Sequence, residues 1–124
     1  MKLLESGEMY LETIYILSGK GEPVRSLDVA EYMQFSKPSV SRAVGLLKSG
    51  GYLLMDADGY LSLTRVGMDM AKKIYERHTV LTEFLTGLGV DRDTAVADAC
   101  KMEHDISEAS FEAIKKQLNN SRGE

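Results

Sequence analysis

The chain has 124 residues, enough for one ordinary domain or two very small ones with a modest core. Its 44% hydrophobic and 27% charged residues are typical of a soluble globular protein, and a formal net charge of −4 argues against a generally basic nucleic-acid binder. No apolar run approaches the roughly 18 residues of a membrane span. The single cysteine excludes an internal disulfide and favours a cytoplasmic location.

Apolar residues at helical spacing predict two helices in the first third of the chain. The first includes Leu4 and ends at Gly19-Lys20-Gly21, and the second is short, with Ser26 as its N-cap. The positions predicted to face the core are Tyr10, Leu11, Ile14, Tyr15 and Leu17 in the first helix and Leu27, Val29, Ala30 and Met33 in the second.

A third helix follows a tight turn over residues 34–36. Ser36 is its predicted N-cap, and Pro38 lies in the first turn, where its missing N–H costs no hydrogen bond. Gly50-Gly51 ends the helix. The inward-facing positions are predicted to be Val40, Val44, Leu46 and Leu47.

A hairpin and a long helix come next. Residues 52–55 and 60–63 flank the acidic, Gly-ended turn Asp56-Ala57-Asp58-Gly59, which predicts two antiparallel strands. Thr64 is a good N-cap for a helix from about residue 65 to residue 84 or 85.

Two further helices complete the chain. Gly87-Leu88-Gly89 breaks the long helix, and Asp91 or Asp93 starts the next one. The last helix is predicted to begin near Ser107 and to fray at Asn119-Asn120.

Helix, helix, tight turn, helix and hairpin is the order of a winged helix-turn-helix, so the fold class is predicted to be mainly α with a DNA-binding winged domain. Between residues 36 and 51 the chain has three basic residues and no acidic one. Arg42 can donate two hydrogen bonds to a guanine, and Lys48 near the helix end suits a phosphate. The residues predicted to contact DNA are Ser36, Lys37, Pro38, Ser39, Ser41, Arg42 and Lys48.

A second cluster of polar residues lies in the helix that follows Asp91. Cys100, Glu103 and His104 occupy positions i, i+3 and i+4, which share one face of a helix. Thiolate, carboxylate and imidazole groups together suit a transition metal. The alternative interpretation is a half-buried cysteine beside an exposed Glu-His pair at a helix end.

Motifs along nearly the whole chain resemble the diphtheria toxin repressor family of metal-dependent transcriptional repressors. The resemblance is strongest to its short branch, typified by manganese transport regulators, which lacks the SH3-like domain. The motifs are Glu8-Met9-Tyr10-Leu11-Glu12-Thr13-Ile14-Tyr15, Ser36-Lys37-Pro38-Ser39-Val40-Ser41, Leu63-Thr64-x-x-Gly67, Arg77-His78 followed by Glu83-Phe84-Leu85, and Cys100-x-x-Glu103-His104. Their order and separations together are specific.

The resemblance implies a set of metal ligands. Met9, Cys100, Glu103 and His104 match the primary site of the iron-responsive branch, and Glu12 and His78 match ligand positions of the manganese-responsive branch. Sulfur ligands favour Fe²⁺ over the harder Mn²⁺, so Fe²⁺ is the expected effector and Mn²⁺ the alternative.

Two positions depart from the family pattern for an ancillary site. Thr82 replaces a carboxylate and Val96 replaces a histidine, so a conventional ancillary site is not expected. A second metal held by Glu12 and His78 stays open.

The resulting hypothesis is a cytoplasmic, homodimeric repressor that binds operator DNA when loaded with metal and controls metal-uptake genes. Residues 1–65 would form the DNA-binding domain and residues 66–124 a helical metal-binding and dimerisation domain. The apolar residues expected at the dimer surface are Ile74, Val80, Leu81, Phe84, Leu85 and Leu88.

Two alternatives come from other functional classes. One is a winged-helix regulator without metal, controlled by a small molecule or by oxidation of Cys100. The other is a non-haem iron enzyme that uses His78, His104 and Glu103 as its iron ligands. The repressor hypothesis has no small-molecule substrate and no membrane partner.

Overall fold

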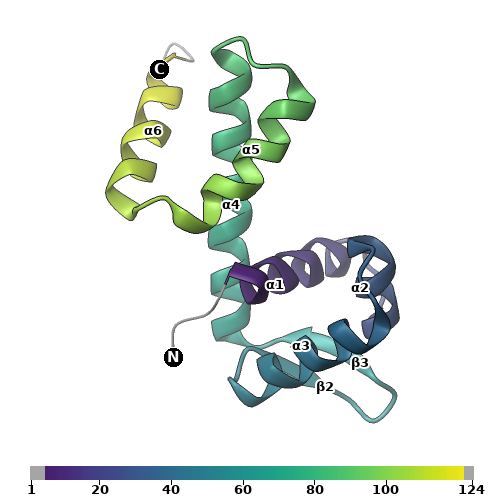
Figure 1. The fold of residues 1–124 in the computed structure, drawn as a ribbon. Coiled ribbons are helices and arrows are strands. Elements are labelled where there is room, and N and C mark those ends of the chain that lie inside the picture. The colour runs from purple at the N-terminus through teal and green to yellow at the C-terminus, as the bar shows by residue number, and fades with distance from the viewer. Residues whose placement is uncertain (1–4, 122–124) are drawn as a thin grey trace. The chain divides into compact units, whose positions relative to one another are not determined.

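The computed structural model describes residues 5–121, and the predicted helical position Leu4 lies outside this range. The described chain is mainly helical and divides into two compact units, one ending at Lys72 and one starting at Lys73 (Figure 1). Its elements are α1 (Glu5–Ser18), β1 (Val24–Arg25), α2 (Ser26–Met33), α3 (Lys37–Ser49), β2 (Leu53–Met55), β3 (Tyr60–Leu63), α4 (Arg65–Gly87), α5 (Arg92–Asp105) and α6 (Glu108–Ser121). None of the described helices combines the length and apolarity needed to cross a membrane.

The first unit is the predicted winged helix-turn-helix, with α1, α2 and α3 followed by a β-hairpin. The sheet has a third strand, β1, that the sequence did not predict. Its order is β1-β3-β2, both pairings are antiparallel, and Val24 lies opposite Leu61. A strand of two residues is too short to show an alternating pattern, so only its pairing with β3 reveals it.

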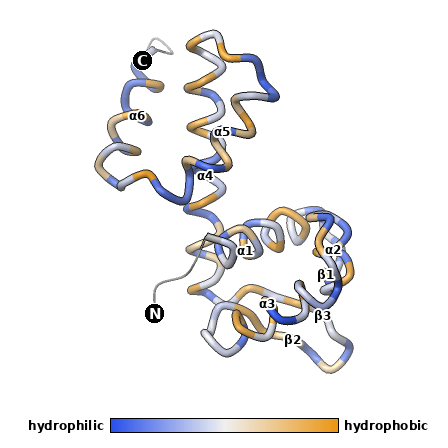
Figure 2. Tube along the Cα trace, in the orientation of Figure 1, coloured by the Kyte–Doolittle hydropathy of each residue, from blue (hydrophilic) through white to orange (hydrophobic). Residues whose placement is uncertain are grey.

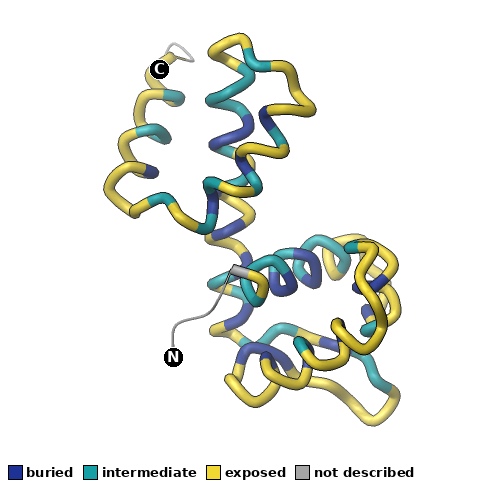
Figure 3. Tube along the Cα trace, in the orientation of Figure 1, coloured by how far each residue is buried: buried dark blue, intermediate teal, exposed yellow. Residues whose placement is uncertain are grey.

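The core of this unit is built from one face of each helix together with the sheet. Apolar residues recur along the helices (Figure 2), and buried positions recur along α1 (Figure 3). The residues that bring the three helices and the sheet into one core include Leu11, Ile14, Val29, Val40, Val44, Leu47, Leu53 and Leu61.

Two predicted core residues and one predicted cap are wrong. The N-cap of α2 is Arg25, and Ser26 is already helical. The backbone N–H of Arg25 donates a hydrogen bond to the Asp28 carboxylate at 2.8 Å. Leu27 is 47% exposed and Leu46 is 66% exposed. Leu46 directly precedes buried Leu47, and successive helical residues point about 100° apart, so Leu46 points toward solvent while Leu47 enters the core.

The helix starts that depend on short-range side-chain bonds agree with prediction. The Ser36 hydroxyl accepts the Ser39 N–H, and the Thr64 hydroxyl accepts the Gly67 N–H at 3.1 Å. Gln34 adopts the left-handed conformation (φ 58°) that turns the chain from α2 into α3.

In the second unit, α5 and α6 pack with the C-terminal part of α4 (Figure 1). Asp91 caps α5 by accepting the Thr94 N–H at 3.0 Å, and the Ser107 hydroxyl accepts the Ser110 N–H at 3.1 Å ahead of α6. Helix α6 continues to Ser121, past the predicted fraying point.

The burial of two residues corrects the predicted dimer surface. Ile74 is 2% exposed and Leu81 is 0% exposed, and both belong to the second unit. Their side chains are already covered in the single chain, so neither is available to a partner. Leu88, in contrast, is 67% exposed.

Candidate metal centre

The buried face of α5 carries a carboxylate among small apolar residues. Ala95, Ala99 and Glu103 follow one another at intervals of four and are each 0% exposed. An ionised carboxylate is costly to remove from water unless it is paired, so the surroundings of Glu103 decide whether this position is tolerated.

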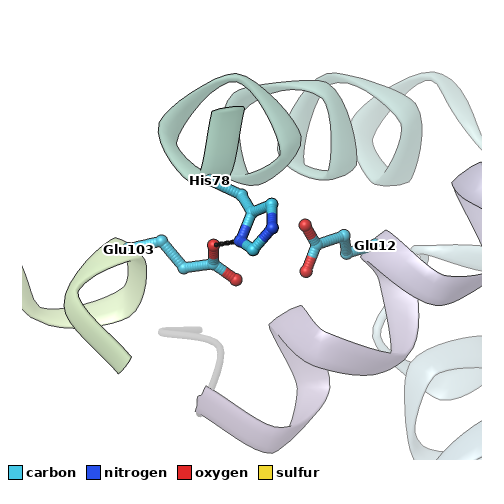
Figure 4. Close-up of side chains that lie close together, drawn as sticks. All are labelled: Glu12, His78 and Glu103. Atoms are coloured by element: carbon cyan, nitrogen blue, oxygen red, sulfur yellow. Dashed lines mark hydrogen bonds and ion pairs between the residues drawn. The ribbon is translucent and has the colours of Figure 1, made fainter. Parts of the chain in front are cut away.

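Two imidazoles contact the Glu103 carboxylate. His78 of α4 places Nδ1 at 2.9 Å from Oε2, the contact drawn as a dashed line in Figure 4. His104, the next residue of α5, places Nε2 at 3.4 Å from Oε1, and its side chain is 1% exposed. The alternative of an exposed Glu-His pair is therefore wrong.

The second carboxylate oxygen provides a test of fit to a cation. Oε1 of Glu103 is buried and accepts no hydrogen bond within the described residues. The 3.4 Å contact with His104 is longer than the usual limit of about 3.2 Å for an N–H···O bond. A buried acceptor without a donor is unfavourable, and a cation bound beside it would remove the penalty.

The remaining predicted ligands lie on α5 and α1. Cys100 is half-buried and lies one turn before Glu103, as the predicted spacing requires. Met9 and Glu12 are half-buried residues of α1 in the first unit; Glu12 is the third residue labelled in Figure 4. The donor set on α4 and α5 thus contains nitrogen, oxygen and sulfur, which suits a divalent transition metal.

Arg77, which directly precedes His78, is a residue for which the sequence predicted no role. Its side chain is buried, at 7% exposure for the residue. The available signal was a charged residue one position from a predicted ligand, on the part of α4 that includes Ile74 and Leu81 in the core. Helical spacing indicates this burial only when the covering helices are known.

The residues predicted to contact DNA lie at the start of α3 and along its exposed face. Ser36, Lys37, Pro38, Ser39, Ser41, Arg42 and Lys48 are all exposed. The Ser36 hydroxyl donates to the Ser39 hydroxyl at 2.8 Å in addition to capping α3.

The hairpin turn between β2 and β3 is held by Asp56. Its carboxylate accepts hydrogen bonds from the backbone N–H groups of Asp58 and Tyr60.

Two family models match the chain in succession. Residues 2–62 match the iron-dependent repressor N-terminal DNA-binding domain, and residues 64–122 match the iron-dependent repressor metal-binding and dimerisation domain.

Several relatives in curated collections are similar to the chain. It is 32% identical over 120 residues to the iron-dependent repressor IdeR of Mycobacterium bovis, covering 96% of this chain and 52% of that protein. It is 33% identical to the regulator MntR of Lysinibacillus sphaericus, covering 88% of this chain and 78% of that protein. It is 32% identical to an HTH-type transcriptional regulator of Methanocaldococcus jannaschii, covering 90% of both. The chain thus spans about half the length of the IdeR relatives.

Solved structures show the same fold. The manganese regulator SloR superposes with a TM-score of 0.83 at 32% identity, covering 91% of this chain and 53% of that one. A manganese-dependent transcriptional repressor in complex with manganese superposes with a TM-score of 0.81 at 25% identity, covering 91% of this chain and 52% of that one.

Proposed function

Because the chain belongs to the iron-dependent repressor family, we propose that it is a metal-dependent transcriptional repressor that binds operator DNA as a homodimer and controls metal-uptake genes. The observation that carries this proposal is the fully buried carboxylate of Glu103, set between the imidazoles of His78 and His104. A buried cluster of this kind has a clear use as a cation site and little use as a stabilising element.

The proposed ligands come from three helices. His78 of α4 and Cys100, Glu103 and His104 of α5 form the part of the set that belongs to the second unit. Met9 and Glu12 of α1 complete the set by their match to the family's ligand positions. A bound metal supplies positive charge; the ligands must be deprotonated to hold it, and the histidines neutral.

Iron is the proposed effector. Met9 and Cys100 offer sulfur, which favours Fe²⁺ over the harder Mn²⁺, and Fe²⁺ is the more available of the metals that accept sulfur ligands. Glu12 and His78 keep Mn²⁺ as the second candidate. The proposal includes a domain boundary near residues 65 and 66, a cytoplasmic location and no small-molecule substrate.

The test is operator binding under anaerobic conditions, with a duplex selected from random DNA by the metal-loaded protein. A chelator should abolish specific binding, and Fe²⁺ should restore it at a lower free concentration than Mn²⁺. Cys100→Ala should lose activation by Fe²⁺, while the matched control Lys101→Ala, at an exposed neighbouring position, should keep it. The double change Met9→Asp with Cys100→Glu should reverse the metal preference.

Three outcomes would count against the proposal in different ways. Specific binding that ignores the chelator favours a regulator without metal, and no specific DNA binding at all contradicts the repressor assignment. A wild type that prefers Mn²⁺, together with a normal metal response of Cys100→Ala, contradicts only the assignment of iron.

A further inference from the structure

The guanidinium of Arg77 bonds the end of the helix that carries Glu103. Arg77 lies on α4, and its Nη1 donates hydrogen bonds to the backbone carbonyl of Glu103 at 3.2 Å and to that of Ile106 at 2.9 Å. Both carbonyls belong to the last turn of α5 or its C-cap. One nitrogen therefore holds two backbone groups more than 25 residues away in the chain.

The same side chain also contacts the start of α6. Its Nη2 donates to the Glu108 carboxylate at 3.2 Å, and its guanidinium lies 5.4 Å from the ring centroid of Phe111, a fully buried residue. A cation over an aromatic ring is favourable, and more so when water is excluded. Arg77 thus joins α4, the end of α5 and the beginning of α6.

The last turn of α5 needs such a partner. The final carbonyls of an α-helix have no intrahelical donor, and a left-handed glycine commonly supplies the missing bonds. Helix α5 ends instead at Ile106 in extended conformation (φ −70°, ψ 138°). The guanidinium supplies donors to these carbonyls, and its charge is favourable at the negative end of the helix dipole.

Arg77 and His78 are neighbours on α4 and contact the same residue of α5. Arg77 bonds the backbone carbonyl of Glu103, and His78 bonds its carboxylate. We propose that Arg77 is a positioning residue for the metal centre, which fixes the end of α5 so that the Glu103 carboxylate meets the His78 imidazole. Its effect on metal binding rests on the proposed function; its effect on the His78–Glu103 contact does not.

The matched variants are Arg77→Met and Lys73→Met. Lys73 also bonds Glu108, at 3.3 Å, but it has no bond to the carbonyls of α5 in the described structure, so its removal tests the loss of the Glu108 ion pair alone. Arg77→Lys keeps the positive charge but loses the planar guanidinium. It is the second test variant, used if Arg77→Met does not fold.

The first readout is the imidazole NMR spectrum of the metal-free protein, which has only two histidines. Both Arg77 variants should change the His78 ring-nitrogen signals that report the bond to Glu103, and Lys73→Met should leave them as in the wild type. The second readout is titration with Co²⁺. Arg77→Met should bind Co²⁺ at least about tenfold more weakly, with an altered d–d absorption spectrum, as expected when a group that orients a ligand is lost.

A loss of thermal stability alone would not support this proposal. Wild-type imidazole signals and an unchanged Co²⁺ spectrum in both Arg77 variants would overturn it, because Arg77 would then only hold the unit together. A wild-type chain that binds no Co²⁺ would instead contradict the proposed function, and the imidazole signals would still decide whether Arg77 positions Glu103.

Discussion

At the scale of single residues, side chains have two kinds of role in this protein. Some satisfy the backbone locally, such as Ser36 and Asp91, which accept N–H groups at helix starts. Glu103 has no such local backbone role; its carboxylate lies on a buried helix face with Ala95 and Ala99. Burial of that charge is unfavourable unless it is paired, and the His78 imidazole at 2.9 Å is its partner.

The first prediction concerns Asp91 and pH. The backbone N–H and then the hydroxyl of Thr94 lower the pKa of the Asp91 carboxyl from its ordinary value of 3.8. A group whose pKa is lowered on folding contributes stability that is present above its ordinary pKa and lost as pH falls through the folded pKa. Asp91→Ala should therefore lower the melting temperature at neutral pH and reduce the loss of stability below about pH 4.

The variant Asp91→Asn separates capping from charge. Asparagine caps helices about as well as aspartate but does not titrate, so this variant should keep most of the neutral-pH stability and lose the acid dependence. Asp93→Asn, in the first turn of the same helix, is the control. Equal acid dependence in Asp91→Asn and the wild type would show that the Asp91 carboxylate does not contribute through its charge.

At the scale of elements, the start of α4 shows why one glycine is required. An added Cβ at Gly67 would lie 2.1 Å from the backbone oxygen of Tyr52 and 3.4 Å from Leu63. The Tyr52 oxygen also accepts the Thr64 N–H at 3.1 Å, so it is held in place. Helix α4 can approach the chain before β2 this closely only because residue 67 has no side chain.

The second prediction compares two glycines. Gly67→Ala should destabilise the protein by about 1–3 kcal/mol, the usual effect of forcing extra volume into a packed site. Gly45→Ala, in the exposed interior of α3 with nothing within 4 Å of the added carbon, should stabilise it by about 0.5–1 kcal/mol. Urea unfolding of the metal-free protein measures both; a Gly67→Ala protein as stable as the wild type would show that the contact with Tyr52 is not decisive.

The third prediction concerns α3 as a DNA-reading helix. Arg42→Ala should weaken binding to the selected operator by about 1–3 kcal/mol and affect random DNA much less, because a bidentate base contact carries discrimination. Lys48→Ala should weaken binding to both and flatten the salt dependence, as expected for a phosphate contact. Equal losses on operator and random DNA for Arg42→Ala would remove it from base readout.

At the scale of the whole molecule, the chain combines two units with different tasks. The family models describe a DNA-binding domain over residues 2–62 and a metal-binding and dimerisation domain over residues 64–122, which confirms the resemblance seen in the motifs. Both Ile74 and Leu81 are used inside the second unit. We therefore expect the proposed dimer surface to use other apolar positions, among them Val80, Phe84, Leu85 and Leu88.

The fourth prediction is a homodimer even without metal, because in the second unit Leu88 is exposed and Val80, Phe84 and Leu85 are only half-buried, and a partner can cover them. Sedimentation velocity of the chelator-treated protein tests it. Leu88→Lys should shift the equilibrium toward monomer. Leu46→Lys, at an almost equally exposed leucine of the first unit (66% against 67%), should not. A wild type that is monomeric until metal is added would contradict this prediction and would show that metal controls dimer formation itself.

Local chemistry was enough to predict several features correctly. The caps at Ser36, Thr64 and Asp91 depend on hydrogen bonds that span three residues, so the sequence contains both partners. The spacing of Cys100, Glu103 and His104 likewise places them on one helix face by geometry alone. The order of helices and hairpin likewise predicted the winged fold, because each element is signalled by local periodicity, caps and turn residues.

Tertiary structure decided what is buried and what meets across the chain. The exposure of Leu27 and Leu46 and the existence of β1 depend on which elements cover them, and periodicity does not encode that. The bond between His78 and Glu103 joins residues 25 positions apart, on α4 and α5, and spacing within one helix cannot predict it. Sequence spacing fixes the face on which a side chain lies, whereas its partner and its exposure to water are fixed by packing against distant segments.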